Sequence, residues 1–214
     1  MGLDLLVEGC ARPGHEAEWR RIMERYLADE QLSDAETEHF PQISTPAYER
    51  LGAPRVGEDP AADAWIIEKL EARTPEEIAS VLTEYRGYYA LPLVKSDGVP
   101  DYTHGGQYDG VDETSFRGSF LSLCTSVLDQ VLINRAWEHK LPEQAVAYGQ
   151  ELLAAAEAAR SSGPRAAPKR GLLGFLGGKR TEPTPLDEQL KIVEAAGRWF
   201  VFWGSRGHPI RAWA

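Results

Sequence analysis

Helix starts are marked in this chain by three dipeptides in which an oxygen-bearing side chain precedes proline: Asp59-Pro60, Thr74-Pro75 and Thr184-Pro185. The side-chain oxygen can accept a hydrogen bond from the first helical turn, and proline fits the first helical position because no donor is needed there. Glu77 completes a capping box with Thr74 and is followed by an apolar stripe with helical spacing. We therefore expect helices over residues 60–73, 75–86 and 185–196, the last one capped by Gly197.

Helical periodicity also predicts three other elements. Between Glu16 and Gln31 the apolar residues recur at i, i+3, i+4 and i+7, which predicts a helix with one face on a core. The longest pattern, over residues 116–139, predicts a central helix, and polar residues such as Asp129 interrupt it too often for a membrane span. Leu141-Pro142 begins a further helix with a seam of small residues, which we expect to form a helical hairpin with the central helix.

Strand patterns occur near the two ends of the chain. The apolar run at residues 3–7 predicts a strand, and the aromatic run at 199–203, followed by a turn and residues 209–213, predicts a hairpin. Four prolines in residues 40–60 indicate an irregular connection. The expected fold is a mainly helical α+β single domain over residues 1–214, in which about five to six helices pack on a small mixed or antiparallel sheet. The N-terminal strand and the C-terminal hairpin would form this sheet, with residues 88–94 as a further candidate strand.

Composition narrows the classes of protein that fit. The chain has 23 Lys and Arg against 33 Asp and Glu, and its net charge of -10 disfavours general nucleic-acid binding. Two cysteines cannot form a disulfide framework, and no basic-then-apolar leader precedes the first strand, so we expect a cytoplasmic protein. No complete catalytic, metal-binding or cofactor-binding motif occurs, so we expect no catalytic residue, no metal and no cofactor.

The acidic loop at residues 95–113 is the first candidate binding site. Loops longer than about 12 to 15 residues without regular structure are often functional or disordered. Its oxygen donors could hold a hard cation, but EF-hand spacing counted from Asp97 places Val99 at a ligand position. A ligand-binding loop and a solvated acidic loop both remain open. The candidate ligand-binding residues are Asp97, Asp101, Tyr102, His104, Tyr108, Asp109 and Arg117.

Residues 161–183 differ from the rest in composition and predict a flexible basic and apolar insertion within the domain. Basic pairs that bracket apolar side chains allow weak contact with an anionic membrane surface or with a protein partner, although a plain linker is the favoured alternative. Gly178-Lys179 is not part of a phosphate loop, because Leu173 and Arg180 replace residues that this motif requires. The candidate contact residues are Lys169, Arg170, Leu172, Leu173, Phe175, Leu176, Lys179 and Arg180.

Cysteine and arginine give weaker signals. Cys124 lies on an apolar stripe, which is typical of a small buried side chain, and Cys10 lies five residues before His15 without a third orienting group. The arginines beside glycines at positions 86, 117 and 206 could line a cleft for a carboxylate or phosphate. Salt bridges to surface acids explain the same arginines and are favoured.

Three segments, Met1–Asp4, Phe116–Cys124 and Ala195–Gly204, resemble the corresponding parts of uncharacterised bacterial proteins, and phage-associated proteins share a similar opening. The resemblance spans the two ends and the predicted central helix. It implies a soluble bacterial protein and brings neither an activity nor a site residue with it.

These patterns favour a soluble, non-catalytic binding or protein-interaction protein of the bacterial cytoplasm, with the acidic loop and the aromatic C-terminal hairpin at the edges of its surface. One specific form is an acidic, immunity-like inhibitor of a basic toxin or nuclease. Two alternatives stay open: an enzyme with a small-molecule cleft lined by the 95–113 loop, and peripheral membrane association through residues 165–180. We expect no transmembrane segment and no nucleic-acid partner.

Overall fold

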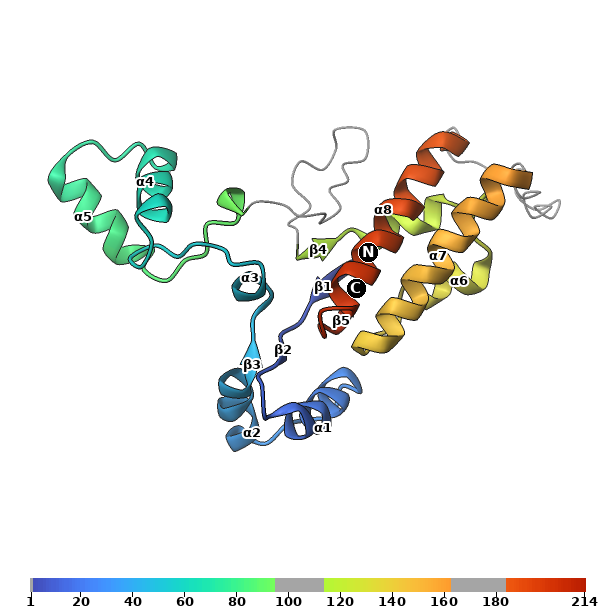
Figure 1. Ribbon diagram of the computed structural model, residues 1–214, viewed down its shortest axis with the longest axis horizontal. Helices are drawn as coiled ribbons and strands as arrows, with labels where there is room; N and C mark the ends of the chain where they lie inside the picture. Colours follow the sequence, from blue (N-terminus) through green and yellow to red (C-terminus); the bar gives the residue numbers. More distant parts are fainter. Residues whose placement is uncertain (1, 95–113, 163–183) are drawn as a thin grey trace, which may run out of the picture. The chain divides into compact units, whose positions relative to one another are not determined.

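The computed structural model describes residues 2–94, 114–162 and 184–214 (Figure 1). In these ranges the chain is mainly helical with a small antiparallel sheet, so the predicted α+β class is confirmed. The chain divides into two compact units. The first holds residues up to Ser44 and those from Gly98 onward, and the second runs from Thr45 to Asp97.

The sheet of the first unit has β1 (Asp4–Val7) between β4 (Ser115–Phe116) and β5 (Ile210–Trp213), with both neighbours antiparallel. Leu5 lies opposite Phe116 on one side and Ala212 on the other, and its side chain is fully buried. The predicted N-terminal strand is confirmed. The predicted C-terminal hairpin is wrong, because only β5 of that region is a strand. Residues 88–94 do not join this sheet either.

The aromatic run at 199–203 lies inside a helix, α8 (Leu186–Gly204). Trp199, Phe200 and Trp203 are fully buried, and the Trp199 ring contacts the Phe116 ring of β4 with centroids 5.9 Å apart. Strand propensity depends on context, so the burial of these large rings from a helix outweighs it. The helix also continues through Gly197, so the predicted cap there is wrong, and its N-cap is Pro185 instead of Thr184.

The helix predicted from Pro142 is confirmed as α7 (Pro142–Ser162), and it packs along α8 (Figure 1). Gly149 of α7 and Gly197 of α8 lie at a close approach of the two backbones. A Cβ atom on Gly149 would lie 2.7 Å from the Gly197 carbonyl oxygen, closer than real contacts of this kind. The glycines are therefore needed for their missing side chains, which let the two backbones approach. The helical hairpin that includes α7 is thus made with α8 and not with residues 116–139.

Residues 116–139 do not form one long helix. They contain the end of β4, the 3-10 helix η3 (Gly118–Leu123) and the short helix α6 (Gln130–Arg135). Gly118 packs on Leu3, and a Cβ atom there would lie 2.7 Å from Leu3 Cδ2. Asp129 begins a new helix because its side chain accepts a hydrogen bond from the Leu132 amide at 2.9 Å. Of the apolar residues on the predicted stripe, Phe116, Cys124, Val127 and Leu128 are buried, although from separate turns. Leu123, Val131 and Trp137 of the same stripe are exposed.

Near the N-terminus, α1 (Glu16–Leu27) confirms the helix predicted from residue 16. Trp19, Ile22 and Met23 on its buried face form a core cluster with Ile43. The region expected to be an irregular connection is preceded by α2 (Asp34–His39). The predicted connection, residues 40–60, is not irregular throughout. It contains η1 (Phe40–Ile43), β3 (Ser44–Thr45) and α3 (Ala47–Arg50), and β3 pairs with β2 (Cys10–Ala11).

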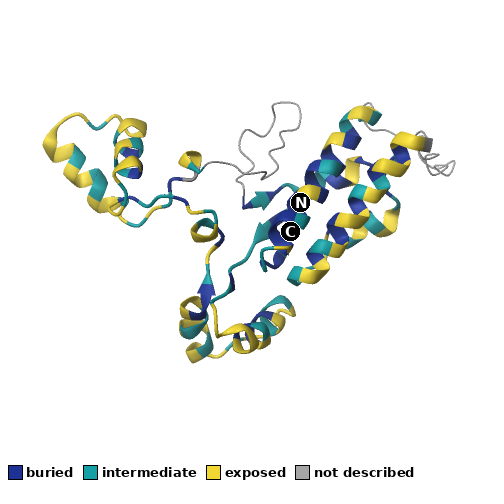
Figure 2. Ribbon diagram, viewed as in Figure 1, coloured by how far each residue is buried: buried dark blue, intermediate teal, exposed yellow. Residues whose placement is uncertain are grey.

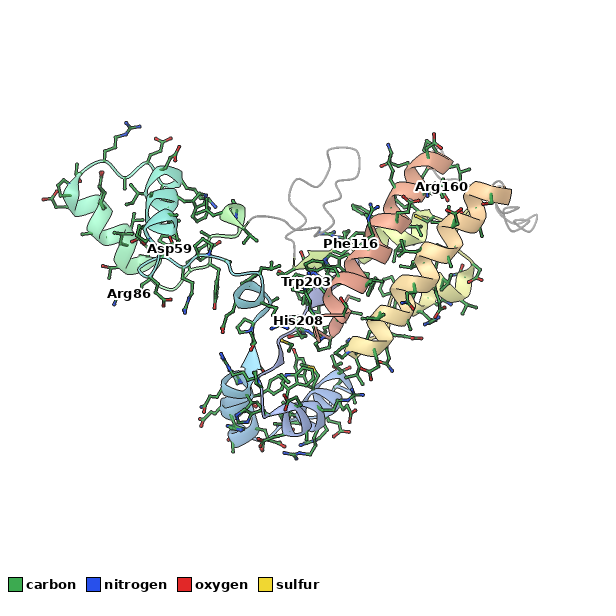
Figure 3. All side chains as sticks on the ribbon, in the orientation of Figure 1. Asp59, Arg86, Phe116, Arg160, Trp203 and His208 are labelled. Atoms are coloured by element: carbon green, nitrogen blue, oxygen red, sulfur yellow. The ribbon has the colours of Figure 1, made fainter. Side chains whose placement is uncertain are left out.

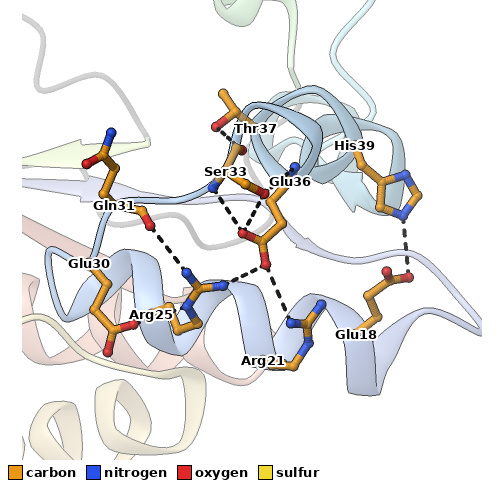
Figure 4. A network of polar contacts seen from close by, with 9 residues as sticks. All are labelled: Glu18, Arg21, Arg25, Glu30, Gln31, Ser33, Glu36, Thr37 and His39. Carbon is orange, nitrogen blue, oxygen red and sulfur yellow. Dashed lines mark hydrogen bonds and ion pairs between the residues drawn. The ribbon is translucent and has the colours of Figure 1, made fainter.

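A polar network joins α1 to α2 (Figure 4). Ser33 and Glu36 form a capping box at the start of α2, and the Glu36 carboxylate also accepts a hydrogen bond from Arg25 Nη1 of α1 at 2.6 Å. Hydrogen bonds from Ser33, together with the Arg25 charge, lower the pKa of Glu36. The charges of this junction are compensated internally, so its role is structural.

The second unit contains α3, α4 (Pro60–Lys69), α5 (Pro75–Glu84) and the 3-10 helix η2 (Leu91–Leu93). Asp59 caps α4, and Thr74 forms the predicted capping box with Glu77 at the start of α5. The α4 helix ends earlier than expected, at Lys69. The core cluster of the unit consists of Val56, Ala62, Ile66 and Ala90. By contrast, α5 contains no buried residue (Figure 2).

Candidate functional site

Most of the predicted site residues lie outside the described ranges. This applies to Asp97, Asp101, Tyr102, His104, Tyr108 and Asp109, and to Lys169, Arg170, Leu172, Leu173, Phe175, Leu176, Lys179 and Arg180. Their roles stay predictions. The exception is Arg117, whose Nε lies 2.5 Å from an Asp4 carboxylate oxygen. This ion pair joins the start of η3 to β1.

The three arginines beside glycines have different environments. Arg117 is ion-paired with Asp4, and Arg206 donates to the Phe202 carbonyl at 3.1 Å while its guanidinium lies 3.5 Å from the centroid of the Phe202 ring. Both arginines therefore serve internal contacts, but only Arg117 forms the salt bridge to an acid that the favoured interpretation expects, because Arg206 contacts a carbonyl oxygen and a ring instead. Arg86, labelled in Figure 3, differs, because it forms no hydrogen bond or ion pair with any residue in the described part of the chain. It also borders a surface hollow.

Neither of the two cysteines forms a disulfide, and both are buried. Burial raises the pKa of the Cys124 thiol to about 12. Because the thiolate is the reactive form of cysteine, this environment opposes nucleophilic chemistry at Cys124. Its interpretation as a small buried side chain is thus confirmed.

Within residues 2–94, 114–162 and 184–214, no group of three or more His, Cys, Asp or Glu side chains could hold a metal ion. No helix in the same ranges has the length and apolarity to cross a membrane.

The aromatic surface expected at the C-terminal end is largely internal. Trp199, Phe200 and Trp203 belong to the core of the first unit, as does His208, which is fully buried (Figure 3). Trp213, at 61% exposure, is the aromatic residue of this end that faces solvent. The interpretation of residues 199–203 as one edge of a binding surface is therefore wrong.

A different aromatic surface is found in the second unit, on the loop after α5. Backbone hydrogen bonds from Val56 N–H to Tyr88 O at 2.9 Å and from Gly87 N–H to Val56 O at 2.8 Å hold this loop. Gly87 has φ +82°, a left-handed conformation that glycine adopts without a steric penalty. The turn brings Tyr85 and Tyr88 together next to α4.

The rings of this surface contact one another in order. Tyr88 stacks on Trp65 of α4 with centroids 6.3 Å apart and planes 9° from parallel, and Tyr85 meets Tyr88 edge-on at 6.1 Å. Lys69 Nζ lies 4.8 Å from the centroid of the Trp65 ring. Trp65 and Tyr85 pack against the core cluster, whereas Tyr88 is 49% exposed. We call Trp65, Tyr85 and Tyr88 the aromatic patch.

A shallow hollow of about 280 Å³ lies between the end of α4 and the start of α5. It combines apolar side chains with two carboxylates, and its lining residues are Leu70, Glu71, Ala72, Glu77, Ser80 and Val81. Leu70 is 40% exposed, so apolar surface stays open to solvent there. We call this the acidic hollow.

Sequence reasoning did not find this surface, because the stripe of α5 predicts a helix without saying how much of the stripe is covered. The stripe of Ile78, Val81, Leu82 and Tyr85 is only half-buried. A signal was present in the tyrosine-rich loop, where Tyr85, Tyr88 and Tyr89 fall within five positions.

No protein-family model, curated protein or solved structure matches the chain.

Proposed function

We propose that this chain is a non-catalytic protein-interaction protein whose second unit binds a basic protein partner. The aromatic patch and the acidic hollow are the two parts of the proposed docking surface. An immunity-like inhibitor of a basic toxin or nuclease in the bacterial cytoplasm is the specific form that we favour.

The observation that carries the proposal is the incomplete burial of α5. This helix has an apolar stripe, yet none of its residues is buried among the described parts of the chain. A helix normally buries such a stripe against another element, so a partner would gain from covering it. The half-exposed Tyr88 on Trp65 strengthens the argument, because tyrosine and tryptophan dominate the residues on which binding energy depends.

Charge supports a basic partner over an acidic one. Residues 45–94 contain nine acidic and five basic side chains, a net charge of -4 for this stretch. In the acidic hollow, Leu70 and Val81 offer apolar contact beside Glu71. A lysine or arginine side chain has an apolar stem and a cationic end, so it matches this combination.

Both cysteines are buried and neither forms a disulfide, which supports the cytoplasmic part of the proposal because disulfides are rare in that compartment.

Site-specific photo-crosslinking tests the proposal. A benzophenone amino acid replaces Tyr88 in cells that naturally produce the chain, and the crosslinked proteins are identified by mass spectrometry. The matched control places the same amino acid at Val131 in the first unit, a position that is apolar and 66% exposed. We expect a product specific to position 88 whose partner is a basic protein.

The partner is then purified for calorimetry with the full chain. The double variant Trp65→Ala with Tyr88→Ala should weaken Kd by about 30-fold or more, the loss typical of interface hot spots. Affinity should also fall as salt is added, because complementary charges attract the partner. A crosslink of equal yield from Val131, an acidic partner or no crosslink at position 88 would each contradict the proposal.

A further inference from the structure

A second hollow in the same unit carries a different inference. It encloses about 410 Å³ and is lined by Gly57, Asp63, Leu82, Thr83 and Arg86. This volume lies in the range of pockets that bind small molecules. Its residues come from α4, from α5 and from the two turns that flank this helix pair.

Gly57 fixes the two charged side chains of the hollow. Its backbone N–H donates to Asp63 Oδ1 at 2.6 Å, which holds the carboxylate on one side. A Cβ atom on Gly57 would lie 3.2 Å from Arg86 Cγ, so the stem of Arg86 crosses the space that a side chain would fill. Gly57 also has φ +81°, a conformation that disfavours other residues. A single glycine thus holds the anion by a hydrogen bond and leaves room for the stem of the cation beside one hollow.

These opposite charges do not neutralise each other. Arg86 forms no ion pair with Asp63 or with any other residue that the structure describes, and Asp63 is held by the Gly57 amide. The Thr83 hydroxyl donates to the Ala79 carbonyl at 2.8 Å, which leaves its lone pairs as acceptors toward the hollow. Leu82 adds an apolar wall.

We propose that this hollow binds the zwitterionic head group of a free α-amino acid. The ligand carboxylate pairs with Arg86, because guanidinium groups bind carboxylates through two parallel hydrogen bonds. The ligand ammonium pairs with Asp63 and donates to Thr83 Oγ1, and an apolar ligand side chain packs against Leu82. A simple acid would be repelled by Asp63 and a simple amine by Arg86, so the zwitterion is the best match. This inference goes beyond the protein-interaction proposal and does not depend on it.

Titration of the full ¹⁵N-labelled chain with leucine tests the site. We expect saturable shifts of the Gly57, Leu82 and Thr83 amide signals, with Kd on the order of 1 mM for so small a ligand at an open site. The two comparison probes are 4-methylpentanoate, which lacks the amine, and 3-methylbutylamine, which lacks the carboxylate. Each should bind about tenfold more weakly or worse, because one charged hydrogen-bond partner is missing.

Variants of the two charged residues complete the test. Arg86→Gln and Asp63→Asn should each weaken leucine binding about tenfold, and asparagine keeps the acceptor for the Gly57 amide. The matched control is Arg73→Gln, which removes an arginine whose side chain is 81% exposed from the same unit and should leave binding unchanged. The spectra of the variants report directly on whether the unit is folded.

The outcomes separate the alternatives. An absence of saturable shifts with leucine overturns the inference, as does equal binding of 4-methylpentanoate or an equal loss from Arg73→Gln. Trp65→Ala with Tyr88→Ala should keep leucine binding, so failure of the interaction proposal and failure of this one are distinguishable.

Discussion

Substitution of Gly149 by alanine probes a close backbone contact between α7 and α8. A Cβ atom at this position would lie 2.7 Å from the Gly197 carbonyl oxygen and 2.9 Å from Phe200 Cβ. The first of these atoms belongs to the backbone of α8 and cannot rotate away. The two helices would have to separate locally, which disturbs the burial of Phe200 in the core of the first unit.

The expected magnitude follows from two opposing effects. Alanine is more favourable than glycine in a helix interior by about 1 kcal/mol. Overpacking of a filled core costs about 1 to 3 kcal/mol, and a backbone obstacle argues for the upper value. The net loss for Gly149→Ala is therefore about 2 kcal/mol. At Gly197 the nearest atoms are Cγ and Cδ2 of the half-buried Leu153, and the Gly149 carbonyl oxygen is farther away, at 3.0 Å, so Gly197→Ala should cost less than Gly149→Ala.

Urea unfolding followed by tryptophan fluorescence measures both variants, since Trp199 and Trp203 are buried in α8. The control Gln150→Ala changes an exposed neighbour of Gly149 and should alter stability by less than about 0.5 kcal/mol. If Gly149→Ala is neutral or stabilising, or if Gly197→Ala is the more harmful of the two, the close approach of the backbones is refuted.

Three further predictions concern individual side chains. Burial lowers the pKa of Lys140 from 10.5 to about 8. Between these two pH values the folded chain therefore binds fewer protons at this residue than the unfolded chain. The free energy of unfolding, measured relative to Lys140→Met, should thus rise by up to about 3 kcal/mol from about pH 7 to about pH 11. Parallel pH profiles in chemical denaturation would contradict this. Cys10 and Cys124 are buried, so Ellman's reagent should label fewer than one thiol per native chain and both thiols in denaturant. Rapid labelling of both thiols in the native chain would contradict their burial. His139 Nδ1 accepts the Ala212 amide at the outer edge of β5, so His139→Ala should speed hydrogen exchange at Ala212, and an unchanged rate would remove this role.

Local signals predicted the elements whose causes are local. The capping box at Thr74 and the cap at Asp59 are present, because each depends on residues within one helical turn. The long helix predicted over residues 116–139 failed for a tertiary reason. Its apolar residues have helical spacing, but some are buried from separate turns and others, such as Val131, are exposed, and periodicity does not distinguish these cases.

The aromatic segments show why the candidate surface could not be predicted. Residues 199–203 and the pair Trp65 and Tyr88 are both aromatic, and from the sequence alone either group could lie in a core or on a surface. Trp199 and Trp203 are covered because α8 lies against both a sheet and α7, whereas the second unit offers α4 and α5 only a small core cluster. The exposure of a residue thus depends on how much of the folded chain surrounds it. A short segment of sequence does not contain this information. The arginines follow the same rule: Arg117 has Asp4 as an ion-pair partner from a distant strand, and what sets Arg86 apart is the hollow that it borders.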